Sequence, residues 1–281
     1  MNILYATDGS EGAKPGAEFL HHLPLTEQDS VCLLTVVQSE EGKAEGAPVL
    51  DTAQTIIGDT PATVHRYIRH GNAALEIIDA INWMAAEVSC DLIVVGTRGL
   101  TGIARFFLGS VAERVARFAP TSVLVAHNIH GPLRRIVIGF DGSRTARRAV
   151  DYVRKLPLTP DCEICLATMV TPSEAAGFLP AFIQKEIATV RQEERHTAEK
   201  GLQEMAQQLQ ESGVRVVTVV EEAEPASGLL YLAEQHKADL IVVGAQGHSE
   251  VELFLLGSVS DKVLRNSPCS TLIVRSRSVA A

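Results

Sequence analysis

One long segment of this chain occurs twice. The stretch that runs from Asp91 to Ala126 returns without a gap from Asp239 onward, with about half of its positions unchanged. The opening is repeated as well, because ILYATDGS at residues 3–10 is echoed by IVIGFDGS at residues 136–143. The repeat is therefore a whole domain rather than a short solenoid unit. We place the two domains at residues 1–130 and 131–281, and call them the first and second half.

Each half alternates short apolar strands with amphipathic helices. In the first half we expect strands at residues 2–7, 31–37, 63–69, 92–95 and 122–126, and helices at 12–22, 72–87 and 110–118. In the second half we expect strands at 135–140, 164–170, 214–220, 240–243 and 270–274, and helices at 145–156, 227–236 and 258–265. A Gly, Glu and Pro-rich excursion at 39–61 is replaced in the second half by one long helix between 180 and 212. Continuous apolar strands that alternate with helices predict a doubly wound, mainly parallel α/β sheet.

The charge and composition exclude several classes of partner. A net charge of −9 argues against a general nucleic-acid or anionic-membrane surface, because both need basic patches. No apolar run approaches membrane-spanning length, and Met1 leads directly into a strand without a signal-like leader. We therefore expect a cytoplasmic protein. The 5 cysteines, an odd and scattered number, suit reduced thiols.

Cys162 and Cys165 have C-x-x-C spacing. A redox pair needs its first cysteine at a helix N-terminus, whereas this pair begins an apolar strand. Residues three apart in a strand point to opposite faces. No second C-x-x-C completes a zinc site, so we interpret both cysteines as structural.

Glycines recur at the same spacing after the fourth strand of each half, in the pattern G-x-x-G, nine residues, then G-S. They are Gly96, Gly99 and Gly109-Ser110 in the first half, and Gly244, Gly247 and Gly257-Ser258 in the second. The carboxyl ends of parallel strands meet at one rim, where Asp8 and Asp141 also end the first strands. Glycines let a polyanion approach the main chain, and a helix N-terminus favours phosphate. Turn formation, helix capping and shared folding needs are the alternative reasons for these residues.

The charges in the two loops differ. Arg98 and Arg105 could add cationic contacts in the first half, where the second half has Gln246 and Leu253, with His248 nearby. Glu250 and Glu252 add negative charge to the second loop. We therefore expect the first half to bind an anionic ligand more tightly than the second.

The two aspartates, the glycine loops and the Gly-Ser pairs resemble those of the universal stress protein family, in its tandem, ATP-binding form. The resemblance covers essentially the whole chain and implies a five-stranded, Rossmann-like fold in each half, similar to that of adenine nucleotide alpha hydrolases. It also implies ATP at the rim, with Asp8 and Asp141 near the ribose and phosphates, and with Mg held mainly by the phosphates. Main-chain groups around Val36 and Val37, and around Met169 and Val170, would face adenine. The glycine loops, Ser110 and Ser258 would hold the triphosphate. Gln246 departs from the family pattern, which usually has Arg or His there.

Other nucleotide and catalytic motifs are absent from the sequence. There is no Walker A motif, no G-x-G-x-x-G, no G-x-S-x-G and no H-E-x-x-H. Without a dedicated phosphate lysine or a positioned base, we expect binding rather than turnover and assign no catalytic residue. The chain is interpreted as an ATP-binding, nucleotide-responsive stress regulator that acts on an unidentified protein partner. A slow ATPase or nucleotidyl-handling enzyme, and a sensor of another adenine nucleotide such as a cyclic dinucleotide, remain the alternatives.

The last strands, at residues 122–126 and 270–274, are apolar edge candidates. An exposed apolar edge invites pairing, and the short linker at residues 127–134 keeps the halves close together. The family that the chain resembles dimerises through this strand. We expect the halves to form a pseudo-dimer through these strands, and a further homodimer is left open.

Overall fold

The structure is a computed structural model that describes residues 1–84, 89–97, 108–129, 131–172, 181–247 and 256–275. The first half contains β1 (Asn2–Ala6), α1 (Lys14–His22), β2 (Ser30–Val37), α2 (Lys43–Ile57), β3 (Thr63–His70), α3 (Ala73–Met84), β4 (Leu92–Gly96), α4 (Ser110–Phe118) and β5 (Ser122–Ala126). The second half contains β6 (Arg135–Gly139), α5 (Arg144–Lys155), β7 (Glu163–Val170), α6 (Ala181–Gln210), β8 (Arg215–Glu222), α7 (Pro225–Gln235), β9 (Leu240–Gly244), α8 (Ser258–Asn266) and β10 (Ser270–Val274).

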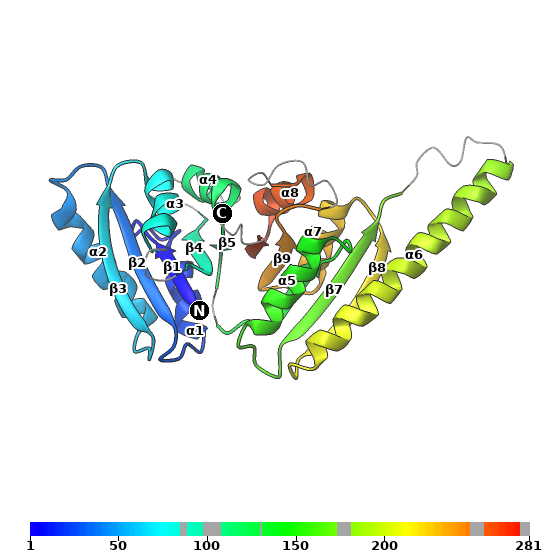
Figure 1. Ribbon diagram of the computed structural model, residues 1–281, viewed down its shortest axis with the longest axis horizontal. Helices are drawn as coiled ribbons and strands as arrows, with labels where there is room; N and C mark the ends of the chain where they lie inside the picture. The colour runs from blue at the N-terminus through cyan, green and yellow to red at the C-terminus, as the bar shows by residue number, and fades with distance from the viewer. Residues whose placement is uncertain (85–88, 98–107, 130, 173–180, 248–255, 276–281) are drawn as a thin grey trace.

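All of these strands belong to one ten-stranded sheet, in the order β3-β2-β1-β4-β5-β10-β9-β6-β7-β8. Neighbouring strands are parallel within each half, and β5 pairs with β10 in the antiparallel sense, with Leu124 opposite Leu272. Figure 1 shows these two strands at the centre of the molecule. The expected pairing of the last strands is confirmed. It joins the two five-stranded units into one continuous sheet.

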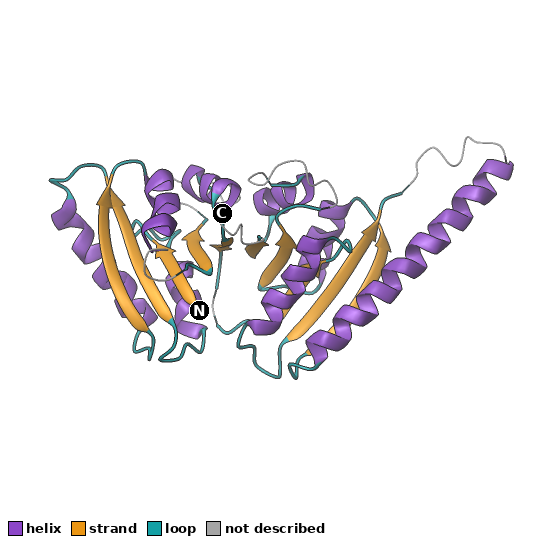
Figure 2. Cartoon of the chain, in the orientation of Figure 1, coloured by secondary structure: helices purple, strands orange, loops and turns teal. Residues whose placement is uncertain are grey.

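The helices cover the two faces of the sheet in separate layers (Figure 2). Helices α1, α2, α5 and α6 bury Ala17, Leu50, Val150 and Leu209 in one hydrophobic core that runs through both halves. Helices α3 and α4 form the core on the other face of the first half, and α7 and α8 form that of the second half. The halves therefore share buried apolar contacts as well as a strand ladder, and both stabilise their association.

Helix α2 corrects the sequence interpretation, which treated residues 39–61 as an irregular excursion. Its buried residues, Gly46, Leu50, Ala53 and Ile57, have the spacing of one helix face. A Cβ atom at Gly46 would lie 2.9 Å from Ile68 and 3.0 Å from Thr35, so the glycine allows the helix to approach the sheet closely. Gly46 and Pro48 suggested a break in the sequence, but tertiary packing outweighs their low helix propensity.

Helix α6 has 30 residues and buries Leu202, Met205 and Leu209 near its C-terminal end. It packs on β7 and β8, and its N-terminal part extends past the edge of the sheet in Figure 1. In the part of the chain that the structure describes, no helix has the length and apolar run needed to cross a membrane.

The two cysteines of the C-x-x-C pair are buried in different cores. Cys162 belongs to the core beneath α5 and α6, and Cys165 to the core beneath α7 and α8, so they lie on opposite faces of the sheet. Burial raises the pKa of each thiol to about 11. Both cysteines act as small core residues rather than as a redox pair.

Candidate functional site

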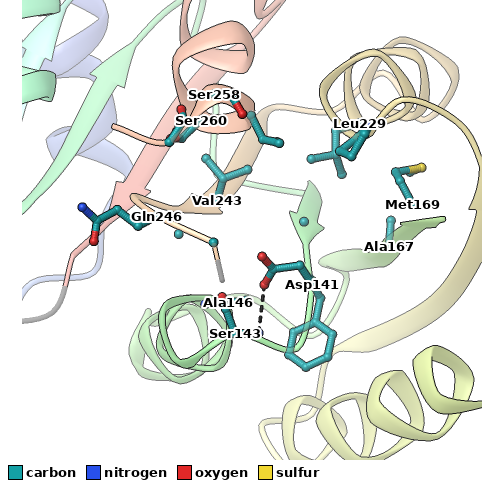
Figure 3. Close-up of a pocket in the computed structure, with 17 residues that line it drawn as sticks. Asp141, Ser143, Ala146, Ala167, Met169, Leu229, Val243, Gln246, Ser258 and Ser260 are labelled. Carbon is teal, nitrogen blue, oxygen red and sulfur yellow. Dashed lines mark hydrogen bonds between the residues drawn. The ribbon is translucent and has the colours of Figure 1, made fainter. Parts of the chain in front are cut away.

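A cavity of about 410 Å³ opens at the carboxyl ends of β6, β7 and β9, between the N-termini of α7 and α8 (Figure 3). Its size lies within the range of ordinary ligand pockets, about 300–1,000 Å³. Asp141 is the one charged residue among the described residues that line it. The lining residues are Gly139, Phe140, Asp141, Ser143, Ala146, Ala167, Met169, Pro225, Leu229, Val243, Gly244, Gln246, Gly247, Gly257, Ser258, Val259 and Ser260.

Asp141 is held by the turn that follows β6. Its Oδ1 accepts a hydrogen bond of 2.9 Å from the backbone N–H of Ser143, and Gly142 has a φ of 81°, which favours glycine. The Ser143 hydroxyl caps α5 by accepting from the N–H of Ala146 at 3.1 Å. A Cβ atom at Gly247 would lie 2.8 Å from the Asp141 Oδ2, so glycine is needed for the loop to pass this carboxylate.

Helix α8 presents its N-terminus to the cavity. Gly257 is the N-cap residue, and its N–H donates to the carbonyl of Ala245 at 2.8 Å. Ser258 is therefore the first helical residue rather than the cap, and it is exposed. The first N–H groups of a helix have no acceptor within the helix and carry its positive pole. This end of the cavity can hold an anion without a lysine or arginine.

The opposite end of the cavity is apolar. It is formed by Ala167 and Met169 of β7 and by Leu229 of α7 (Figure 3). Pro225, the first residue of α7, also lines the cavity. A Cβ atom at Gly228 would overlap the Met169 sulfur, so this glycine makes room for the methionine side chain. The cavity thus joins a polarisable apolar wall to a helix N-terminus, which suits a ligand that has a flat ring at one end and an anion at the other.

Glu224 and Lys262 connect the two helices that flank the cavity. The Glu224 carboxylate caps α7 by accepting from the N–H of Ser227 at 3.0 Å, and it also accepts from Lys262 Nζ at 2.7 Å. Hydrogen bonds from Lys262 and then from Ser227 lower the Glu224 pKa to about 2. The ion pair holds the start of α7 against α8.

The first half contains the same construction at the carboxyl ends of its own strands, which run antiparallel to those of the second half. Asp8 Oδ1 accepts from the N–H of Ser10 at 3.0 Å, and the Gly109 N–H donates to the Thr97 carbonyl at 2.6 Å ahead of the exposed Ser110. The glycine that ends β4 has a packing role as well, because a Cβ atom at Gly96 would overlap the Gly12 carbonyl oxygen. The sequence interpretation gave this position to phosphate approach, with turn formation and shared folding needs as the alternatives.

The structure brings part of the predicted site together. Asp141, Met169, Gly244, Gly247, Gly257 and Ser258 line the cavity, whereas its described lining does not include Val170. Val36 and Val37 end β2, and Val36 packs against the core beneath α3 and α4. Seven loop positions of the prediction lie outside the described residues: Arg98, Gly99, Arg105, His248, Glu250, Glu252 and Leu253.

Sequence reasoning missed the wall from α7, namely Pro225 and Leu229. A signal was present, because Pro225 comes three residues after the end of β8 at Glu222 and proline favours the first turn of a helix. It also missed Ser260, which is buried and donates to the carbonyls of Ala245 and Gly257, each at 2.9 Å. That side chain joins Ala245, which follows β9, to the N-terminus of α8.

Comparisons with known proteins agree with this architecture. The profile of the universal stress protein family matches residues 1–127 and again residues 132–275. A universal stress protein of Methanocaldococcus jannaschii is 36% identical over 143 residues, which cover 50% of this chain and 82% of that protein. A universal stress protein of Synechocystis is 24% identical, and the match covers 98% of this chain and 99% of that protein. The solved universal stress protein from Archaeoglobus fulgidus has a TM-score of 0.68 at 21% identity, covering 99% of this chain and 98% of that one. The chain therefore belongs to the universal stress protein family, in a tandem arrangement that matches the family once in each half.

Proposed function

We propose that the protein binds an adenine nucleotide, ATP, in the cavity of the second half and at the corresponding rim of the first half. The observation that carries the proposal is the union of the apolar Met169 and Leu229 wall with the N-terminus of α8 in one cavity. A purine ring is flat and apolar on its faces, and a polyphosphate is the anion that a helix N-terminus favours. Nucleotide bound at the glycine loops would change a surface that a protein partner reads, so that the protein acts as a nucleotide-responsive regulator.

Different residues of the cavity would contact different parts of the nucleotide. Met169 and Leu229 would contact the adenine ring, and the amides around Gly257 and Ser258 would hold the phosphates. Asp141 lies between these ends, where the ribose would sit. Mg would be held mainly by the phosphate oxygens, whose charge it reduces.

Regulation by binding fits the lining better than rapid turnover does. Phosphoryl transfer depends on cations that stabilise the transferring group. Among the described lining residues of this cavity, none is a lysine or an arginine. A steady-state phosphate-release assay distinguishes a slow ATPase from a regulator. Competition between ATP and a cyclic dinucleotide distinguishes an ATP-binding protein from a sensor of another adenine nucleotide.

Titration calorimetry with Mg-ATP tests the proposal on the full chain. Gly257→Val is a suitable variant because a Cβ atom there has 3.5 Å to its nearest neighbours, Ala245 O and Gln246 Cα, at an ordinary φ of −67°. The branched side chain should fold in place and obstruct the phosphate end. Gly131→Val is the matched control, because a Cβ atom at Gly131 meets nothing within 4 Å.

We expect two binding events in the parent protein and in Gly131→Val, and the loss of one of them in Gly257→Val. Adding Gly109→Val should remove the other event. Unchanged ATP affinity in a folded Gly109→Val, Gly257→Val protein would show that the glycine loops do not hold the phosphates.

A further inference from the structure

A second cavity, of about 390 Å³, lies between the two halves and is separate from the site at the strand ends. Three segments enclose it: the end of α1 with the residues after it, the linker between the halves, and the turn between α5 and β7. Its lining residues belong to both halves, so the cavity exists only when the halves are paired. Its size is that of a pocket for one small molecule.

The repeat itself builds this cavity. Leu-Pro-Leu-Thr occurs at residues 23–26 after α1 and again at residues 156–159 after α5. The two copies form the same tight turn, in which the Leu25 N–H donates to the Leu23 carbonyl at 2.7 Å and the Leu158 N–H to the Leu156 carbonyl at 2.8 Å. Pairing of the halves brings both turns to one pocket. Prolines in all three wall segments restrict the backbone, so the walls are ordered before a ligand binds.

The lining is mostly apolar. Phe19, Leu23 and Leu133 are each less than a tenth exposed, and Leu158 packs against the core that the halves share. The polar side chains of the described lining are those of His21, His22 and Thr159, and none of these lining residues is an acid, a lysine or an arginine. The walls of the cavity are therefore mostly apolar and include a few side chains that can form hydrogen bonds.

The electrostatics differ from those of the strand-end site. Helix α1 ends at His22, so its negative pole faces this cavity, whereas α8 directs its positive pole at the other. Desolvation, followed by repulsion from His21, lowers the pKa of His22 and favours its neutral form. His21 Nδ1 lies 3.0 Å from the Ile57 carbonyl oxygen, which orients that ring. A neutral imidazole and the end of a helix accept hydrogen bonds, and neither attracts an anion.

We propose that this cavity is a second ligand site, for an uncharged aromatic molecule that carries one hydrogen-bond donor. The ring would lie among Phe19, Leu133 and Leu158, and the donor would meet His22. Because both halves and the linker contribute to the walls, the ligand would bind only the paired state and stabilise it. The site is independent of nucleotide binding at the strand ends.

Fluorescence titration with N-phenyl-1-naphthylamine tests the proposal, because this neutral aromatic amine has one N–H and emits strongly in apolar pockets. Its sulfonated relative, 1-anilinonaphthalene-8-sulfonate, is the matched anionic probe. We expect saturable binding of the amine at one site and at least about tenfold weaker binding of the sulfonate, a difference of about 1.4 kcal/mol. Leu158→Trp, which fills the cavity, should weaken binding of the amine by about tenfold or more. Leu229→Trp, which fills the strand-end cavity, should leave it unchanged.

The proposal is overturned if the amine fails to saturate, if ATP displaces it, or if Leu229→Trp rather than Leu158→Trp removes its binding. A stronger response to the sulfonate would contradict the charge argument. If Leu158→Trp does not fold, NMR of the histidine side chains in the parent protein provides a second test. Saturation with the amine should shift the His22 resonance, assigned by its loss in His22→Gln, and an unmoved His22 resonance would refute the site.

Discussion

The guanidinium of Arg117 on α4 lies 2.6 Å from the carboxylate of Asp261 on α8, across the boundary between the halves. The repeat produces a second pair of the same kind, in which Arg265 lies 2.6 Å from Glu113. Each arginine also approaches the acid on its own helix, at 3.6 Å for Arg117 and 3.0 Å for Arg265. The four side chains form a closed ring of alternating charge. The two acids lie one turn into α4 and α8, so the ring joins the N-terminal parts of these two helices across the halves.

Reversing one charge in this ring should destabilise the paired halves. Arg117→Glu places like charges together, and we expect it to lower the free energy of unfolding by about 1 kcal/mol, since both Arg117 and Asp261 are about a third exposed. Reversing all four charges of the ring, by adding Glu113→Arg, Asp261→Arg and Arg265→Glu to Arg117→Glu, keeps the signs alternating and should recover part of the loss. Chemical denaturation measures both effects. Arg195→Glu is the control, because its pair with Glu199 is more exposed and lies within α6. An equal loss in the control would remove any special role for the ring.

A proline at the centre of the sheet should separate the halves. Leu124 pairs with Leu272 across the junction and with Val94 inside the first half. Leu124→Pro removes a backbone donor from this part of the ladder, so we expect two unfolding transitions or new oligomers in solution scattering. Leu124→Ala removes the side chain and keeps the donor. If the proline variant melts in one transition with an unchanged scattering profile, as the alanine variant should, the strand junction is not what holds the halves together.

The sequence allowed most of this fold to be predicted, because the repeat tests every assignment twice. Strand runs such as residues 92–96 and 240–244 read alike in both halves, and their ends locate the rim. Helix α2 could not be predicted, because Gly46 and Pro48 resemble breakers until Ile68 and Thr35 are seen beneath the helix. Local propensity contains no information about that contact.

The candidate site was predicted in part, for a similar reason. Asp141 and the glycine loop each follow a strand, so both can be recognised as site candidates from the sequence. Leu229 is one apolar residue of an amphipathic helix and has no local mark that distinguishes it from core. The cavity between the halves was missed although Leu-Pro-Leu-Thr is repeated, because the two turns meet only after β5 and β10 pair.

Acid should weaken the contact between α7 and α8. Hydrogen bonds hold the folded-state pKa of Glu224 at about 2, below its ordinary value of 4.5, so ionised Glu224 stabilises the fold above pH 4.5. That stabilisation is lost as the pH falls from about 4.5 to about 2. Glu224→Gln should flatten the dependence of the melting temperature on pH in this window and leave the dependence at higher pH unchanged. A parent and a variant with parallel profiles between pH 2 and 4.5 would rule out this ion pair as the cause.

The two proposed nucleotide sites should differ in affinity, the first half binding ATP more tightly. Its loop carries Arg98 and Arg105, whereas the second loop carries Glu250 and Glu252. A charged contact contributes about 1–3 kcal/mol when desolvated and less when exposed. Calorimetry should therefore show that Gly109→Val removes the tighter event and Gly257→Val the weaker one.

A variant in the second half tests the cause of this difference. Gln246 lines the cavity of the second half, and Gln246→Arg returns a cation to the phosphate end. We expect it to strengthen ATP binding at the weaker site by up to about tenfold, with a dependence on salt concentration, because the added attraction is screened by ions. Gln246→Met, which has a similar length and no charge, should not strengthen binding. The order of the sites is reversed if Gly257→Val causes the larger loss, and the charge argument fails if Gln246→Met strengthens binding as much as Gln246→Arg does.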